Sequence, residues 1–228
     1  MTSRPQPVSR RERPAKPALT RDGIIATAVR VMRAEGLQRV TMRRLAQELD
    51  TGPASLYVYV ANTAELHAAI LDELLGEVDL RPAAADGDWR ERIAAVLASY
   101  SHLLFQHPSL AQSAVVARPS GPNYLNLLEA LLTLLGQGGV PDDQAAWGVD
   151  VLLQVATASA AEHAGRDDSS DSAQESNAAA AVANAPSAKV PHVAAMAAEL
   201  LSGTPQERQM WRTRMLLNGI LHTPRATS

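Results

Sequence analysis

The sequence predicts an all-α protein with a small N-terminal three-helix unit and a larger C-terminal helical domain. Apolar residues make up 46% of its 228 residues and aromatic residues only 4%, and Ala and Leu dominate. That composition favours helices over sheets. Apolar residues also recur at spacings of three and four along most of the chain, which is the period of an amphipathic helix.

Charge divides the chain into a basic N-terminal part and an acidic remainder. Residues 1–60 carry eleven Lys or Arg against five Asp or Glu, a net charge of +6. The remainder carries ten basic and nineteen acidic residues, a net charge of −9. This asymmetry predicts a polyanionic partner for the N-terminal part only.

Several classes of protein are excluded or disfavoured by composition. The chain has no Cys, which excludes disulfides, thiolate zinc sites and cysteine nucleophiles. No apolar run is long enough to span a bilayer, and the Arg- and Pro-rich N-terminus lacks the apolar region of a secretory signal. We therefore expect a cytoplasmic protein with no membrane partner.

Residues 1–19 hold five basic residues among four prolines and are predicted to form a basic disordered arm. Such an arm can follow phosphates or enter a minor groove, and a solubilising tail remains an equal alternative. The first helix begins at Thr20 or Asp22 and ends at Gly36, with apolar residues at helical spacing between them.

The segment 41–59 reads as two short helices around a tight turn. Thr41 is a candidate N-cap for the first, and Leu45 follows Val40 at the spacing of a hydrophobic staple. Asp50-Thr51-Gly52-Pro53 breaks that helix, and Pro53 suits the first turn of the next. Two helices so joined are typical of a helix-turn-helix, whose second helix enters the DNA major groove.

The residue types in this segment suit DNA. Arg43 and Arg44 attract phosphate near a helix N-terminus, and the hydroxyl-bearing side chains reach phosphates or base edges. Pro53 and Ala54 offer small apolar surfaces of the kind that meet a thymine methyl. A plain helical hairpin with solvated arginines remains the alternative on this pattern alone.

A fourth helix over 62–79 is predicted to connect the helix-turn-helix domain, residues 20–66, to the domain of residues 80–228. Asn62 and Glu65 resemble a capping box, and the apolar stripe that follows is long enough to enter both domains. A helix shared by two domains can transmit a tilt from one to the other.

The pattern stays helical through the C-terminal domain. Low-complexity residues 165–188 interrupt it and are predicted to form a mobile loop with a little helix. The expected helices cover 89–106, 108–118, 122–135, 141–163, 190–201 and 205–221.

The run from Ser55 to Leu66 resembles the recognition-helix segment of the TetR family of transcriptional regulators, with its Leu-Tyr pair and the capped helix that follows. The resemblance spans roughly residues 19–75. Beyond it, segments such as His107-Pro108-Ser109-Leu110 look like one large branch of that family. Thr63 departs from the pattern, because the family usually has a phosphate-binding Lys there.

The resemblance implies a homodimeric repressor that is released from a palindromic double-stranded DNA operator by a small-molecule effector. It is not expected to be an enzyme or to need a cofactor. The DNA-contacting residues that the resemblance implies are Thr41, Arg43, Arg44, Thr51, Pro53, Ala54, Ser55, Tyr57, Tyr59 and Thr63.

Candidate pocket and interface residues are the polar-tipped or aromatic side chains and the compact helix faces of the C-terminal domain. The expected ligand-binding residues are Tyr100, His102, Phe105, Tyr124, Trp147, Gln154 and Thr157. The expected dimer-interface residues are Ala156, Ala160, Trp211, Leu217, Asn218 and Leu221. No metal site is expected, because His102 and His107 are five residues apart and do not share a helix face.

Other functions stay open on the sequence. An effector-independent DNA-binding regulator or an activator fits the same residues. A helical enzyme is disfavoured, because the chain lacks a Gly-rich phosphate loop and a His-Glu metal spacing. A protein-binding helical scaffold is the remaining alternative, and it predicts that Tyr57→Phe and Arg43→Ala are harmless.

Overall fold

The computed structural model describes residues 18–116, 119–164 and 169–225. Every regular element in these residues is a helix, and none is a strand. The predicted all-α fold is therefore confirmed. The basic arm predicted over residues 1–19 lies almost wholly outside the described residues. Among the helices that are described, none is both long and apolar enough to cross a membrane.

The head consists of α1 (Arg21–Glu35), the 3-10 turn η2 (Leu37–Arg39), α2 (Met42–Glu48) and α3 (Pro53–Leu56). Thr20 caps α1 by accepting a hydrogen bond from the Gly23 amide at 3.1 Å. Gly36 ends α1 at a φ of 88°, a conformation that glycine adopts without steric cost. Ile24, Leu45 and Leu56 are fully buried between the three helices.

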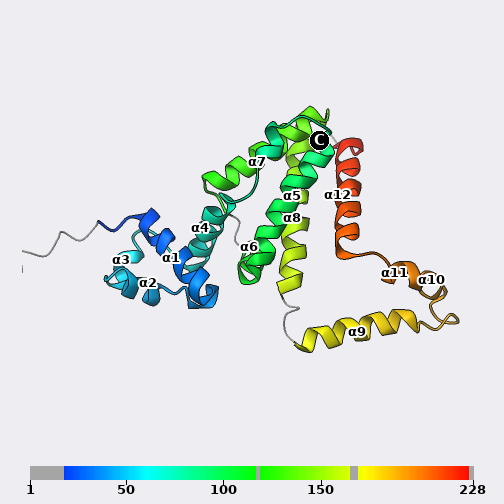
Figure 1. Cartoon of the computed structure of the whole chain (residues 1–228), viewed down its shortest axis with the longest axis horizontal. Coiled ribbons are helices and arrows are strands. Elements are labelled where there is room, and N and C mark those ends of the chain that lie inside the picture. The colour runs from blue at the N-terminus through cyan, green and yellow to red at the C-terminus, as the bar shows by residue number, and fades with distance from the viewer. Residues whose placement is uncertain (1–17, 117–118, 165–168, 226–228) are drawn as a thin grey trace, which may run out of the picture.

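Helix α4 (Thr63–Leu75) joins the head to the rest of the molecule (Figure 1). Asn62 accepts a hydrogen bond from the Glu65 amide at 2.8 Å, as the sequence predicts. The helix ends at Leu75 rather than 79, because single turns replace the helical bonds beyond Gly76. It packs on α1 in the head and on α6 and α7 in the body. An Arg33–Glu77 ion pair adds a further tie between α1 and the chain just after α4.

The body is a bundle in which the long α8 packs most extensively on α5 and α6 (Figure 1). A short 3-10 turn, η3 (Arg81–Ala84), leads into it. Caps and prolines set the helix starts: Asp88 accepts from two amides of α5, and Pro122 occupies the first turn of α7. The helices are α5 (Trp89–Gln106), α6 (Pro108–Val116), α7 (Pro122–Gln137), α8 (Asp142–Ala164) and α12 (Pro205–His222).

A loop is predicted over 165–188, but the described part of that segment is mostly helical. It contains α9 (Ser169–Ala183), followed by α10 (Pro191–Ala195) and α11 (Ala197–Leu201). The alanine run at residues 178–181 explains the helix, because Ala has the highest helix propensity and low complexity does not by itself imply disorder. The three helices form an arm that packs mainly on itself and extends beside the body (Figure 1).

Candidate nucleic-acid interface and ligand cavity

The turn between α2 and α3 leads into α3, a very short helix that packs on the core of the head. Asp50 takes a positive φ of 47°, which Asp tolerates better than most residues, and the Thr51 amide donates to the Ala46 carbonyl at 2.9 Å. Helix α3 spans only four residues and cannot be stable alone. Leu56 and Val60 are fully buried, so packing against the head core holds α3 in place.

The outer face of α2–α3 presents most of the predicted DNA-contacting residues. Tyr57 is 53% exposed, while Thr51 and Tyr59 are half-buried. Thr41 is exposed, but its hydroxyl already accepts from the Arg44 amide at 3.1 Å, so it serves as the N-cap of α2. Arg43, Pro53, Ala54 and Ser55 are also exposed, as is Thr63 at the start of α4.

Val58 is a residue that the sequence interpretation missed. It is 80% exposed between the two tyrosines that follow α3. An apolar side chain left in water at this position can meet a thymine methyl or a sugar. Its place between Tyr57 and Tyr59 was the available signal.

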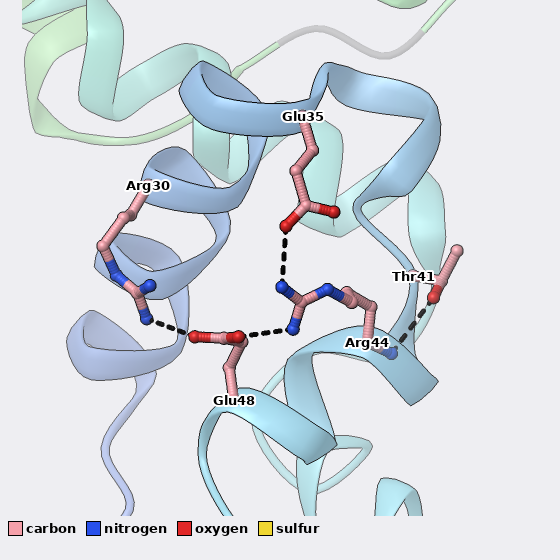
Figure 2. Close-up of polar contacts among 5 residues, drawn as sticks. All are labelled: Arg30, Glu35, Thr41, Arg44 and Glu48. Atoms are coloured by element: carbon pink, nitrogen blue, oxygen red, sulfur yellow. Dashed lines mark hydrogen bonds and ion pairs between the residues drawn. The ribbon is translucent and has the colours of Figure 1, made fainter.

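Arg44 does not point freely to solvent as a phosphate clamp would. Its guanidinium binds Glu35 at 2.7 Å and Glu48 at 2.5 Å, and Glu48 also binds Arg30 at 2.9 Å (Figure 2). We call these four side chains the α1–α2 ion network. Hydrogen bonds from Arg44 lower the pKa of Glu35 and of Glu48 below the usual range, so both stay ionised.

Arg43 is the contrasting neighbour. It is exposed, and no ion pair holds it among the residues that the structure describes. The sequence pattern made the two arginines equivalent, but the structure separates them. Arg43 is available to a phosphate, whereas Arg44 sets the position of α2 against α1.

The body contains a cavity of about 390 Å³ between α4, α5, α6, α7 and α8. Four of the seven predicted ligand-binding residues line it: Tyr100, Tyr124, Gln154 and Thr157. Leu71 of α4 also lines it, and the sequence interpretation missed this residue because it belongs to an ordinary apolar stripe. Mostly apolar walls with a few polar groups are typical of a small-molecule site.

The polar groups of this cavity are ordered. The Thr157 hydroxyl donates to the Leu153 carbonyl at 2.7 Å, and Tyr100 is 2.6 Å from the same hydroxyl. Since a hydroxyl has one proton, Tyr100 is the donor to Thr157. Burial raises the pKa of Tyr100 to about 12, so its phenol is neutral at ordinary pH.

The other three predicted ligand residues do not face this cavity. His102 and Phe105 line a separate opening of about 960 Å³ between α5, α8 and the segment from α9 to α12. They lie two and five residues after Tyr100, which at 100° per residue turns them to other faces of α5. Trp147 is 61% exposed near the start of α8, with the Arg225 guanidinium 3.7 Å above its ring.

Two of the predicted dimer-interface residues belong to the subunit core instead. Ala160 is fully buried and Leu217 is 1% exposed, because both lie on helix faces that pack within the subunit. Trp211 is 67% exposed, and Asn218 is also exposed. Ala156 and Leu221 are half-buried.

This geometry defines a helix-turn-helix protein whose head is joined by one helix to a hollow helical body. Family models match both parts. Residues 24–70 match the model described as "Bacterial regulatory proteins, tetR family", and residues 81–220 match "Tetracyclin repressor-like, C-terminal domain". The chain belongs to the TetR family, as its sequence motifs indicate.

Solved structures agree with this assignment. The transcription regulator SCO7704 of Streptomyces coelicor is 55% identical, with a TM-score of 0.80 over 93% of this chain and all of that one. Apo ActR of Streptomyces coelicolor is 33% identical, with a TM-score of 0.78 over 90% of this chain and 97% of that one. ActR has also been solved in complex with actinorhodin and with (S)-DNPA.

A curated relative is the transcriptional repressor DrrR1 of Streptomyces coeruleorubidus. It is 36% identical over 135 residues, which are 59% of this chain and 50% of the relative. The chain thus aligns with about half the length of the first curated relatives that it matches.

Proposed function

We propose that this protein is a ligand-responsive transcriptional repressor that binds a palindromic DNA operator as a homodimer and leaves it when a small molecule enters the body. The observation that carries the proposal is the position of α4. It is the next helix after α3 in the chain, and its Leu71 lines the 390 Å³ cavity. One rigid element therefore connects the place where DNA is read to the place where a ligand fits.

In the proposed complex, α3 enters the major groove. Pro53, Ala54 and Ser55 face base edges from the exposed side of α3, and Tyr57 donates to a phosphate. Arg43 supplies a fixed charge to the backbone next to them. Thr63 supplies a hydroxyl rather than the family's ammonium, so this contact adds no charge.

The effector we propose is small, mainly apolar and able to accept or donate a few hydrogen bonds. The cavity volume lies within the usual range of small-molecule sites. Gln154 and Asp150 supply polar groups at one wall and Tyr100 at another. The ActR complexes with small molecules support an effector for this body as well.

The proposed dimer forms through α8 and α12. Large apolar side chains are exposed along these two helices at Trp147, Val151, Trp211 and Met215. Large apolar side chains exposed on two neighbouring helices are typical of a protein–protein interface. TetR-family regulators act as dimers, which places two heads on one operator.

The test is a mobility-shift titration on DNA selected from the genome by the purified protein, repeated over a salt series. We expect a dimer-stoichiometric shift on a palindromic sequence that weakens steeply as salt rises. Addition of actinorhodin and of chemically related small molecules then tests release. Failure to select any sequence would contradict the DNA-binding proposal, and a selected sequence that no compound releases would favour an effector-independent regulator.

A further inference from the structure

Asp72 is a nearly buried carboxylate in the middle of α4 that the proposed contacts with DNA and effector do not use. It is 8% exposed. Its Oδ1 accepts a hydrogen bond from the Tyr124 amide at 2.9 Å, in the first turn of α7. Helix α7 has no capping side chain of its own, because its N-cap is Gly121. Asp72 therefore caps α7 from a different helix.

The close approach of the two helices requires glycine. A Cβ on Gly121 would lie 2.1 Å from Oδ2 of Asp72, far inside van der Waals contact. One turn further along α4, a Cβ on Gly76 would lie 3.4 Å from the side chain of Asn123. The C-terminal half of α4 is thus fitted against the first turn of α7. We call Asp72, Gly121 and Tyr124 the α4–α7 latch.

Both helices of the latch contribute a residue to the wall of the ligand cavity. Leu71, next to Asp72, and Tyr124, whose amide Asp72 binds, both line the cavity. An occupant of the cavity therefore touches one residue on each helix of the latch. A second polar contact, between His67 Nδ1 and Ser113 Oγ at 2.9 Å, joins α4 to α6.

We propose that Asp72 is a positioning residue that makes α4 follow α7 when the cavity fills. This inference rests on the proposed function and deepens it. A carboxylate at a helix N-terminus is stabilised by the amides it accepts from and by the helix dipole. If α7 moved alone, Asp72 would stay buried without its partner, which is costly. Movement of α4 with α7 avoids that cost and carries the displacement to the head.

The experiment replaces the unidentified effector by a side chain. Ala158 lines the cavity from α8, and Ala158→Phe places a ring in it. Operator affinity is measured with and without Ala158→Phe in the wild-type background and in Asp72→Ala. We expect the filled cavity to weaken operator binding about 5- to 150-fold in the wild-type background, the span typical of allosteric coupling. In Asp72→Ala the same ratio should fall to about one, because a coupling free energy of zero corresponds to equal affinities.

Two further variants separate the latch from simple loss of stability. Gly121→Ala attacks the latch from α7 and should reduce the ratio as Asp72→Ala does. Glu73→Gln removes a carboxylate from the neighbouring, exposed position of α4 and should leave the ratio unchanged. Circular dichroism and thermal unfolding establish that each variant is folded before its ratio is compared.

The outcomes distinguish this inference from the proposed function. Equal weakening by Ala158→Phe in all backgrounds would overturn the latch and leave the repressor proposal standing. No weakening in the wild-type background would overturn the coupling of this cavity to DNA binding. A folded wild-type protein that binds no selected DNA would overturn both proposals.

Discussion

The two adjacent arginines of α2 should respond differently when each is replaced by alanine. Arg43 is exposed without an ion pair among the described residues, so Arg43→Ala should remove one phosphate contact per subunit. Each lost contact reduces the slope of log affinity against log salt by about 0.9, or about 1.8 for a dimer. Between 50 and 200 mM salt, a slope change of about 1.8 alters the salt-induced loss of affinity by about 12-fold.

Arg44→Ala should leave the slope unchanged, because the Arg44 charge is already bound to Glu35 and Glu48 (Figure 2). It should lower operator affinity by a similar factor at every salt concentration, since α2 loses the Arg44–Glu35 ion pair with α1. Fluorescence anisotropy with labelled operator at four or more salt concentrations measures both slopes. Glu48→Gln tests the other ion pair between α2 and α1, Glu48 with Arg30, and should also lower operator affinity. A slope reduction of about 1.8 in Arg44→Ala would refute the assigned roles.

Three further changes test the packing of the protein. Tyr100→Phe should lower the free energy of unfolding by about 1 kcal/mol in urea titrations, because the hydrogen bond with Thr157 is lost. In the wild type, the folded-state pKa of about 12 exceeds the unfolded value, so Tyr100 should cost stability as pH rises from about 10 to 12, and Tyr100→Phe should flatten that decline. Gly148→Ala should destabilise by about 1–3 kcal/mol in thermal unfolding, because its Cβ would lie 2.6 Å from Ile220. Leu56→Ala should cost about 2–5 kcal/mol and abolish operator binding in anisotropy titrations, because this fully buried side chain anchors α3.

The head was predictable because its signals are local. Thr41 and Asn62 cap the helices that the sequence assigned to them, and the break between α2 and α3 falls at the predicted turn. Caps, turns and prolines act over three or four residues, so a single sequence contains them. The roles of Arg43 and Arg44 were not separable in this way, because the partners of Arg44 include Glu35 on another helix.

The body was less predictable because its sites depend on which helix faces meet. Tyr100 and Phe105 share a helix but face different openings, and Trp147 precedes the α8 residues that line the cavity, which run from Asp150 to Ala158. Leu217 looked like an interface residue and is core, since only the packing of α12 on α8 decides its burial. The residue types indicated which side chains could line a site. The sequence did not indicate which face of its helix each of them occupies.

The tie between the head and α4 has a consequence for how the operator is released. Helix α1 packs on α4 and is joined to its C-terminal end through Arg33 and Glu77, so a swing of α4 moves the head as one piece. The DNA-reading face of each subunit then keeps its shape, while the separation of the two faces changes. One base pair adds about 3.4 Å to a half-site separation. We therefore expect an effector to release the operator by moving two intact reading faces out of register with the half-sites, without changing how either face alone fits DNA.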